Sequence, residues 1–362
     1  MTESNSRLAA ILAGLNIVPN KDITIEEDEY GNIFVVKMPI DIKPTYELGI
    51  DEAGRGPLAG HLVYTALFWE ASPITHYRDS KLVSISRRTE QYLEICSQMP
   101  DVGFVACGLS PLFISLNMLN HMRDVELVKA RNRLNNSRRA VRQPKPSKNG
   151  ETPIETQALP PTEPNPCLST TNSSSTPIDP NPLYISPHRY NLNEISLQCV
   201  SQILSRYILN KIPVTRIFMD ALGPIKTAEE TIRKAMSGAE ALASVVVEKK
   251  ADTKYQVVSA ASIIAKSIRD RLINDPGLQS ALYGQTYTNL GSGYPSDPIT
   301  RSWLKNAFIP VIGVPPIVRC SWKPVLDFLK EHRPATDPNT PPIGTLSLLC
   351  AKPQSESGQN RP

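Results

Sequence analysis

Three apolar stretches of the chain are each followed by acidic residues. Asp51 and Glu52 follow "YELGI", Asp220 closes "RIFM", and Asp270 follows "SAASIIAKSIR". Asp51 and Asp220 stand where an expected strand ends, and that edge of an α/β sheet commonly binds ligands. Carboxylates gathered there would repel one another unless hard divalent ions such as Mg²⁺ or Mn²⁺ lay between them. The pattern therefore indicates a two-ion centre of the kind that cleaves phosphodiesters.

Each acid also has a simpler explanation. An isolated Asp at a strand end is often a turn former or a helix cap, and an Arg-Asp pair within a helix often lies on a solvated face. The five histidines show no zinc-binding spacing, and the chain contains neither GxxxxGK[ST] nor GxSxG. Periodicity alone leaves both explanations open.

The elements that would position these acids alternate between strands and helices. Turn residues bound apolar runs that predict strands, at 46–51, 61–69, 102–110, 215–222 and 243–250. Helical periodicity predicts helices at 84–98, 115–131, 192–209, 226–236 and 257–274. This order is typical of a mixed α/β sheet flanked by helices. Residues 291–332 indicate a small helical C-terminal lobe.

Composition narrows the class of protein. The 362 residues are 40% hydrophobic and carry a formal net charge of +4, which permits a nucleic-acid partner without requiring one. The six cysteines form no CxxC pair, so reduced thiols in an intracellular protein are the simpler interpretation. The N-terminus does not read as a signal peptide, and no apolar run is long enough to span a membrane.

Proline marks a break in the middle of the chain. Ten of the 33 prolines fall between Pro144 and Pro182, where few apolar residues are available for burial, so this stretch is predicted to be disordered. Eight basic residues and no acid precede it between Lys129 and Lys148. That basic stretch is either a solvated helix end or an arm that binds phosphates or directs nuclear import.

Eight motifs follow one another along the chain, namely "LGIDEAGRGPLAGHLVY", "DSKLVS", "LSPLFISLNML", "RYNLNEIS", "FMDALGP", "KADTKYQVVSAASIIAKSIRD", "GSGYPSDPITRSWL" and "VRCSW". This collinear series resembles the type 2 ribonucleases H, and in particular their eukaryotic catalytic A subunits. The likeness covers residues 46–136 in part and 184–330 almost throughout. It implies a ribonuclease H-like fold and an endonuclease that acts on RNA–DNA hybrids and 5′ of ribonucleotides embedded in duplex DNA.

The resemblance also implies roles for individual residues. Asp51, Glu52, Asp220 and Asp270 would be catalytic and would hold two Mg²⁺ or Mn²⁺ ions. Gly54, Arg55 and Gly56 would contact the ribose 2′-hydroxyl and nearby phosphates, which agrees with the close approach that glycine permits. Tyr294 would pack on the nucleotide beside the scissile phosphate, although a buried aromatic before a turn is the simpler explanation. Ser80 and Lys81 would lie near the substrate backbone.

The same resemblance predicts a domain organisation. Residues 1–44 would be an N-terminal extension, and 45–290 a catalytic domain interrupted at 120–188 by a basic and then Pro/Ser/Thr-rich disordered insertion. Residues 291–332 would be the helical lobe and 333–362 a disordered tail. The family runs almost directly across the insertion point and usually has His-Asp where this chain has Leu197-Gln198. Neither departure touches the four acids.

Two other functions remain open at this stage. One is a nucleic-acid-binding subunit that has lost catalysis, and the other is a two-metal nuclease of similar fold, such as a resolvase or an integrase. The resemblance further implies two non-catalytic partner subunits, B and C, and a nuclear location with roles in replication and repair. It leaves open the preferred metal, the role of the insertion and whether the isolated chain is active.

Overall fold

The computed structural model describes residues 3–17, 23–70, 84–119, 183, 190–239, 244–309 and 313–332. Contacts divide the chain into one unit formed by residues 1–122 and 181–362 and a second formed by 123–180. The predicted disorder of the tail, and of the insertion apart from Leu183, falls outside the described residues. Ser80 and Lys81 fall outside them as well.

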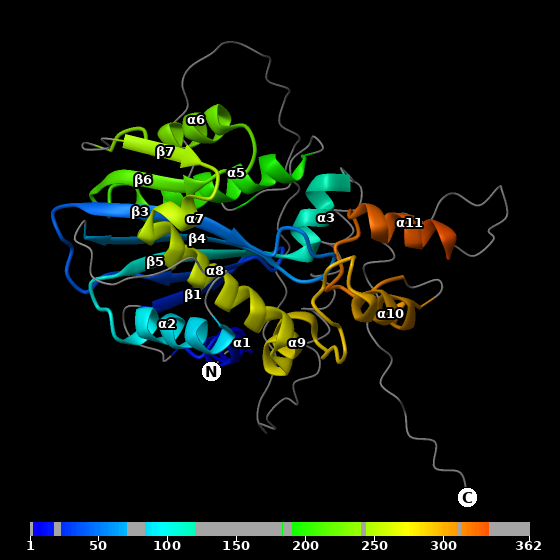
Figure 1. Cartoon of the computed structure of the whole chain (residues 1–362). Coiled ribbons are helices and arrows are strands. Elements are labelled where there is room, and N and C mark those ends of the chain that lie inside the picture. The colour runs from blue at the N-terminus through cyan, green and yellow to red at the C-terminus, as the bar shows by residue number, and fades with distance from the viewer. Residues whose placement is uncertain are drawn as a thin grey trace, which may run out of the picture. The chain divides into compact units, whose positions relative to one another are not determined.

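The described strands form one mixed sheet of seven strands in the order β1-β2-β5-β4-β3-β6-β7 (Figure 1). Neighbouring strands are antiparallel from β1 to β3, whereas β3 and β6, and then β6 and β7, run parallel. The predicted mixed sheet flanked by helices is confirmed. Its strands are β1 (Ile23–Glu27), β2 (Ile33–Lys37), β3 (Tyr46–Ala53), β4 (Leu62–Glu70), β5 (Gly103–Leu109), β6 (Val214–Asp220) and β7 (Ser244–Glu248).

The sheet begins earlier in the chain than the sequence motifs indicate. β1 and β2 fall within the predicted N-terminal extension, yet β2 pairs along its length with β5. All five residues of β2 are buried. A strand that is covered on both faces lacks the alternation of apolar and polar residues that marks a half-exposed strand. A domain boundary at residue 44 would therefore cut through a continuous sheet.

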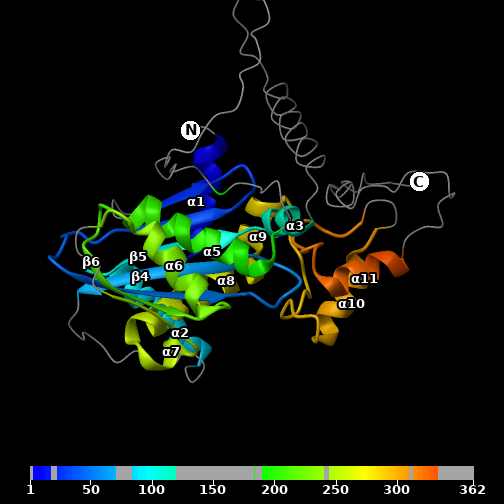
Figure 2. The same ribbon diagram turned by 90° about the horizontal axis from the view of Figure 1, so that it is seen from above.

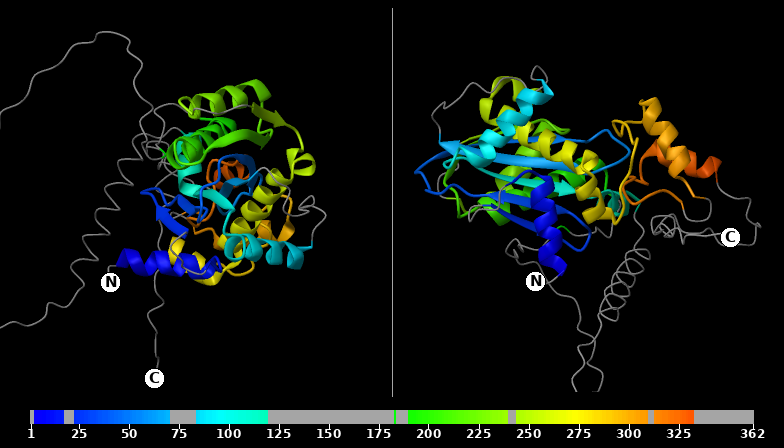
Figure 3. Two further views of the ribbon diagram at one scale, coloured as in Figure 1. Left: turned by 90° about the vertical axis from the view of Figure 1, so that its left-hand side faces the viewer. Right: turned by 90° about the horizontal axis from the view of Figure 1, so that it is seen from below.

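Helices cover both faces of this sheet (Figure 2 and Figure 3). The core on one face joins residues of α1 (Glu3–Gly14), α2 (Ile85–Ser97), α8 (Gln256–Asn274) and α9 (Pro276–Tyr283) to strands β1 to β5. The other face carries α5 (Leu192–Ile203), which contacts β4 and β5. A π-helical turn, η1 (Leu204–Ile208), continues α5, and α6 (Ile225–Ala235) packs beside it. The short helix α7 (Ala251–Lys254) leads into α8.

The close approach of α8 to β3 depends on small residues. A Cβ on Gly49 of β3 would lie 2.4 Å from the backbone carbon of Val257, so only glycine fits beneath the start of α8. The facing helix supplies the buried small residues Ala260, Ala261 and Ser262. This packing places the carboxyl-terminal half of β3 directly under α8.

Several helices begin at a polar residue followed by proline, a signal that the predicted boundaries did not take into account. The Ser110 hydroxyl accepts the N–H of Phe113, so α3 (Pro111–Leu119) begins four residues before the predicted start at 115. The continuation of that predicted helix to 131 is outside the described residues. Asp275 caps α9 in the same way, and Asp297 caps α10 (Pro298–Ala307).

The C-terminal lobe contains α10 and α11 (Lys323–Glu331), and these helices lie beyond one end of the sheet (Figure 1). The loop between them reaches back to the sheet. The backbone N–H of Arg319 donates to the carbonyl oxygen of Leu58 at 2.8 Å, and Ala59 forms an isolated β-bridge with Val318. The lobe is thereby tied to the turn that follows β3. Among the described helices, none is both long and apolar enough to cross a bilayer.

Candidate active site

Asp51 and Glu52 occupy the end of β3, where α8 lies closest to the sheet. Asp51 is 6% exposed, and its Oδ1 accepts the backbone N–H of Glu52 at 2.8 Å. Ser262 of α8 also hydrogen-bonds to the Asp51 carboxylate. Burial, opposed by these two hydrogen bonds and reinforced by the charge of Asp220, raises the pKa of Asp51 to about 6.

Glu52 is held less favourably than Asp51. Burial and the neighbouring charges of Asp51 and Asp220 raise the pKa of Glu52 to about 8, although Arg55 acts in the opposite direction. Its Oε2 is buried and has no hydrogen-bond partner among the described residues. A buried carboxylate oxygen without a partner is costly, so this position is suited to a ligand that supplies positive charge.

Asp220 ends the parallel neighbour of β3. Its Oδ1 accepts the backbone N–H of Ala251 at 3.1 Å, which fixes the carboxylate at the start of α7. Asp220 raises the pKa of both Asp51 and Glu52 by its charge, so the three acids form one electrostatic group. The order of strands and acids in the sequence predicted this meeting at one sheet edge.

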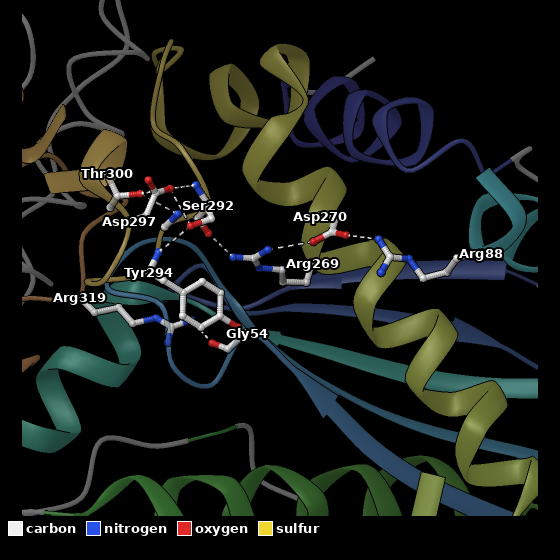
Figure 4. A network of polar contacts seen from close by, with 10 residues as sticks. Gly54, Arg88, Arg269, Asp270, Ser292, Tyr294, Asp297, Thr300 and Arg319 are labelled. Atoms are coloured by element: carbon white, nitrogen blue, oxygen red, sulfur yellow. Dashed lines mark hydrogen bonds and ion pairs between the residues drawn. The ribbon is translucent and has the colours of Figure 1, made fainter. Parts of the chain in front are cut away.

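Asp270, the fourth predicted acid, is engaged by two arginines. One carboxylate oxygen pairs with Arg88 of α2, and the other accepts Arg269 Nη1 at 2.9 Å (Figure 4). The side chains of Arg269 and Asp270 are 14% and 34% exposed. The pair is therefore only partly solvated, and both arginines hold the Asp270 carboxylate.

The glycine turn after Glu52 is held by hydrogen bonds from a buried arginine. Gly54 has φ +85°, and a Cβ there would lie 2.7 Å from the carbonyl oxygen of His61. Arg319 donates to Gly54 O at 2.7 Å, Arg55 O at 3.2 Å and Gly60 O at 2.9 Å. Arg319 is fully buried, which lowers its pKa to about 9 and still leaves it charged at neutral pH.

Arg319 was not predicted as a site residue, although it lies in the quoted "VRCSW" motif. The available signal was a single arginine within an otherwise uncharged motif. If such an arginine is buried, its guanidinium requires several hydrogen-bond acceptors. Three backbone carbonyls around one turn provide them. Arg319 thereby links the C-terminal lobe to the glycine turn.

The side chain of Arg55 points to α5. Its Nη1 donates to Ser196 Oγ at 3.0 Å, and its Nη2 donates to Asn193 Oδ1. Ser196 also accepts the hydroxyl of Tyr64 at 2.6 Å. The structure therefore gives Arg55 protein partners on the opposite face of the sheet from α8, so its direct phosphate contact stays a prediction.

Tyr294 lies beside the same turn, and the buried-aromatic alternative is wrong because the residue is 42% exposed. A Cβ on Gly56 would lie 3.0 Å from Tyr294 Cε1, so the ring and the glycine are in close contact. The Asp297 carboxylate accepts the N–H and the hydroxyl of Ser292 and also caps α10. The loop that carries Tyr294 is therefore well anchored.

These groups line an open pocket of about 360 Å³. It brings together Glu52, Asp270, the Gly54–Gly56 turn and Tyr294, while Asp51 and Asp220 are not among its lining residues. Basic side chains line it as well, namely Arg55, Arg88, Lys266 and Arg269. Such a concentration of positive charge beside carboxylates suits a phosphate backbone.

The four acids are not arranged as a complete set of metal ligands in this structure. Within the part of the chain that the structure describes, no three His, Cys, Asp or Glu side chains are arranged to hold a metal ion. Their chemistry nevertheless fits a hard cation, because Asp51, Glu52 and Asp220 repel one another and Glu52 Oε2 lacks a partner.

Comparisons with known proteins show which family the chain resembles. Residues 174–325 match the family model described as ribonuclease HII. The A subunit of ribonuclease H2 from Bos taurus is 27% identical over 81% of this chain and 76% of its own length. The A subunit from Homo sapiens is 27% identical over 79% of this chain and 73% of its own. Ribonuclease HII of Methanococcus maripaludis is 27% identical over 78% and 86%, respectively.

A solved structure shows the same fold. The ribonuclease H2 from Pyrococcus horikoshii OT3 superposes with a TM-score of 0.50 and 24% identity, over 79% of this chain and 98% of its own. The fold is an α/β fold of the ribonuclease H type. Residues 174–325 carry the match to the ribonuclease HII family, and the chain is similar to the eukaryotic A subunits of ribonuclease H2, as the sequence motifs indicated.

Proposed function

We propose that this chain hydrolyses the RNA strand of RNA–DNA hybrids and nicks duplex DNA on the 5′ side of embedded ribonucleotides. The observation that supports this proposal is the pocket that joins Glu52 and Asp270 to the Gly54–Gly56 turn and Tyr294. Acids that act on a phosphodiester and a turn that admits a ribose lie side by side. The non-catalytic alternative has no comparable support, because all four acids and the turn are present.

The glycine turn would select RNA. The 2′-hydroxyl is the group that distinguishes ribose from deoxyribose, so recognition requires a polar protein atom close to it. The turn lacks side chains at Gly54 and Gly56, and Arg319 fixes its carbonyls from beneath. Backbone groups can therefore approach the sugar with little reorganisation. Tyr294 would pack on the adjacent nucleotide where the ribonucleotide meets DNA.

The acids would hold the reaction centre. Asp51, Glu52, Asp220 and Asp270 would hold two Mg²⁺ or Mn²⁺ ions, which when bound lower the pKa of water and neutralise charge on a departing oxygen. Ser262 and the Glu52 N–H orient the Asp51 carboxylate, and the Ala251 N–H orients Asp220. Arg88, Lys266 and Arg269 would bring the negatively charged backbone to this edge of the sheet.

The cellular role is proposed from the relatives. They are named as A subunits, which supports an assembly, and we propose non-catalytic partners B and C for this chain. Activity on embedded ribonucleotides would serve primer removal and ribonucleotide excision repair in the nucleus.

Cleavage of a duplex with one embedded ribonucleotide tests the proposed function. The full chain, with and without co-purified partners, is expected to nick that duplex in Mg²⁺ or Mn²⁺. Asp220→Asn is expected to lower the rate by at least about 1000-fold, because it removes a charge that the reaction requires. An active Asp220→Asn protein would contradict the proposed roles. A wild-type assembly that nicks no ribonucleotide-containing duplex would favour a non-catalytic role, and cleavage of a four-way junction instead would favour a resolvase.

A further inference from the structure

Arg269 contacts three parts of the pocket that come from different elements. Its Nη1 donates to Asp270 Oδ1 at 2.9 Å, and its Nη2 donates to the carbonyl oxygen of Ser292 at 2.8 Å (Figure 4). Its guanidinium carbon lies 5.9 Å from the centre of the Tyr294 ring. Its aliphatic stem abuts the turn, since a Cβ on Gly54 would be 3.1 Å from Arg269 Cγ.

Arg269 therefore connects a rigid element to a loop. It lies next to Asp270 on α8, which packs on β3 and β4, whereas Ser292 and Tyr294 lie in the loop before α10. Asp297 fixes that loop to α10 through Ser292 and Thr300. In the described residues, Arg269 supplies a hydrogen bond and an aromatic contact that tie the loop to α8.

We propose that Arg269 is a positioning residue that sets the place of Tyr294 relative to Asp270 and the Gly54 turn, and so decides how well the enzyme accepts an isolated ribonucleotide. The proposal rests on the proposed function, because it concerns the same pocket. A continuous hybrid would present ribose along the strand, whereas an embedded ribonucleotide presents only one. Accurate placement of Tyr294 therefore matters most for the embedded ribonucleotide.

This role requires the planar fork of arginine. Two separate nitrogens reach Asp270 and Ser292 at once, and the flat guanidinium lies beside an aromatic ring. A lysine keeps the positive charge but presents one nitrogen, so it cannot span both acceptors in this geometry. Arg88 provides a matched comparison, since it pairs with the other oxygen of Asp270 and comes from α2 rather than from the element next to the loop.

The test compares Arg269→Lys and Arg88→Lys with the wild type, as full chains in the same assembly. Each is assayed for kcat/KM on a duplex with one embedded ribonucleotide and on a continuous hybrid of the same length. Binding of both duplexes is measured by fluorescence anisotropy in EDTA, so that affinity is read without divalent ions. Tyr294→Ala and the double variant Arg269→Lys/Tyr294→Ala complete the set.

Arg269→Lys is expected to lower kcat/KM for the embedded ribonucleotide about tenfold more than for the hybrid, with a parallel loss of selectivity in EDTA binding. Arg88→Lys should affect both substrates equally. In the Tyr294→Ala background, Arg269→Lys should change the selectivity no further. Equal effects of Arg269→Lys on both substrates would overturn the inference. A wild type that nicks neither duplex would instead overturn the proposed function. If Arg269→Lys fails to fold, Arg269→Gln is judged by the same two ratios.

Discussion

At the scale of single residues, Glu52 shows what it costs to place carboxylates close together in a folded chain. It is a half-buried acid beside two others, and its buried Oε2 lacks a hydrogen-bond partner among the described residues. Without divalent ions, the folded chain therefore either holds a proton on Glu52 or carries unfavourable negative charge there. Active sites often retain such groups, because the ligand or substrate relieves the cost.

Replacement of Glu52 by glutamine should stabilise the protein in EDTA. The pKa of Glu52 is raised from 4.5 to about 8 on folding, so the folded state binds its proton more tightly than the unfolded state does. For a raised acid, the contribution to stability is greatest below the unfolded pKa and declines as pH rises through the folded pKa. The difference in melting temperature between Glu52→Gln and the wild type should therefore grow between pH 5 and pH 8.5.

The expected size is on the order of 1 kcal/mol, which corresponds to a rise of about 2–4 °C for a domain of this size. Thermal unfolding across the pH range measures it. Adding Mn²⁺ should reduce the difference, because the wild type gains more from the ion. A difference in melting temperature that does not vary with pH would show that folding does not raise the pKa of Glu52.

At the scale of elements, the contact between α8 and β3 determines which residues reach the pocket. Ser262, Lys266 and Asp270 are four residues apart along α8 and so share one face of the helix. Gly49 allows the start of the helix to lie against the strand. The first two acids and this helical face are therefore positioned by one packing contact.

Gly49→Ala should disrupt that contact. The added Cβ would meet helix backbone at 2.4–2.5 Å, which cannot be relieved by a rotamer change. We expect a loss of about 1–3 kcal/mol in the free energy of unfolding, as measured by urea titration. Gly277→Ala serves as the control, because its nearest neighbour is a side-chain oxygen 3.1 Å away and alanine favours helix. Comparable losses for both variants would contradict this explanation.

At the scale of the whole molecule, the C-terminal lobe holds the glycine turn that lines the pocket. Its residue Arg319 lies under the glycine turn, and Trp322 Nε1 donates to Gly56 O at 3.1 Å. The turn is therefore held between the sheet and a segment 264 positions away in sequence. On the proposed function, the lobe would take part in ribose recognition in addition to any contact with partners.

Arg319→Met should destabilise the chain by about 3–5 kcal/mol, because it removes a buried charge and leaves three carbonyls without their donor. Urea unfolding gives the stability, and limited proteolysis reports whether the turn opens. Arg301→Met on α10 is the control, since Arg301 is exposed. Equal stability of the two variants would show that Arg319 does not hold the turn.

The candidate reacting groups could be predicted from the sequence, since they lie in contiguous motifs. Asp51, Glu52 and Asp220 follow recognisable strands, and strand ends converge at one edge of a sheet. The central strands and α8 were also predicted closely, because apolar periodicity reports burial directly. The two N-terminal strands were missed because five-residue runs carry a weak signal.

Only the tertiary structure determined which side chains contact Asp270 and the glycine turn. Arg319, Arg269 and Arg88 find their partners across 264, 23 and 182 positions of sequence, and no local pattern encodes such pairings. Tyr294 lies beside the turn because Asp297 and Arg269 fix its loop from two sides. Local sequence therefore determined the candidate reacting groups, whereas long-range packing determined how the pocket around them is built.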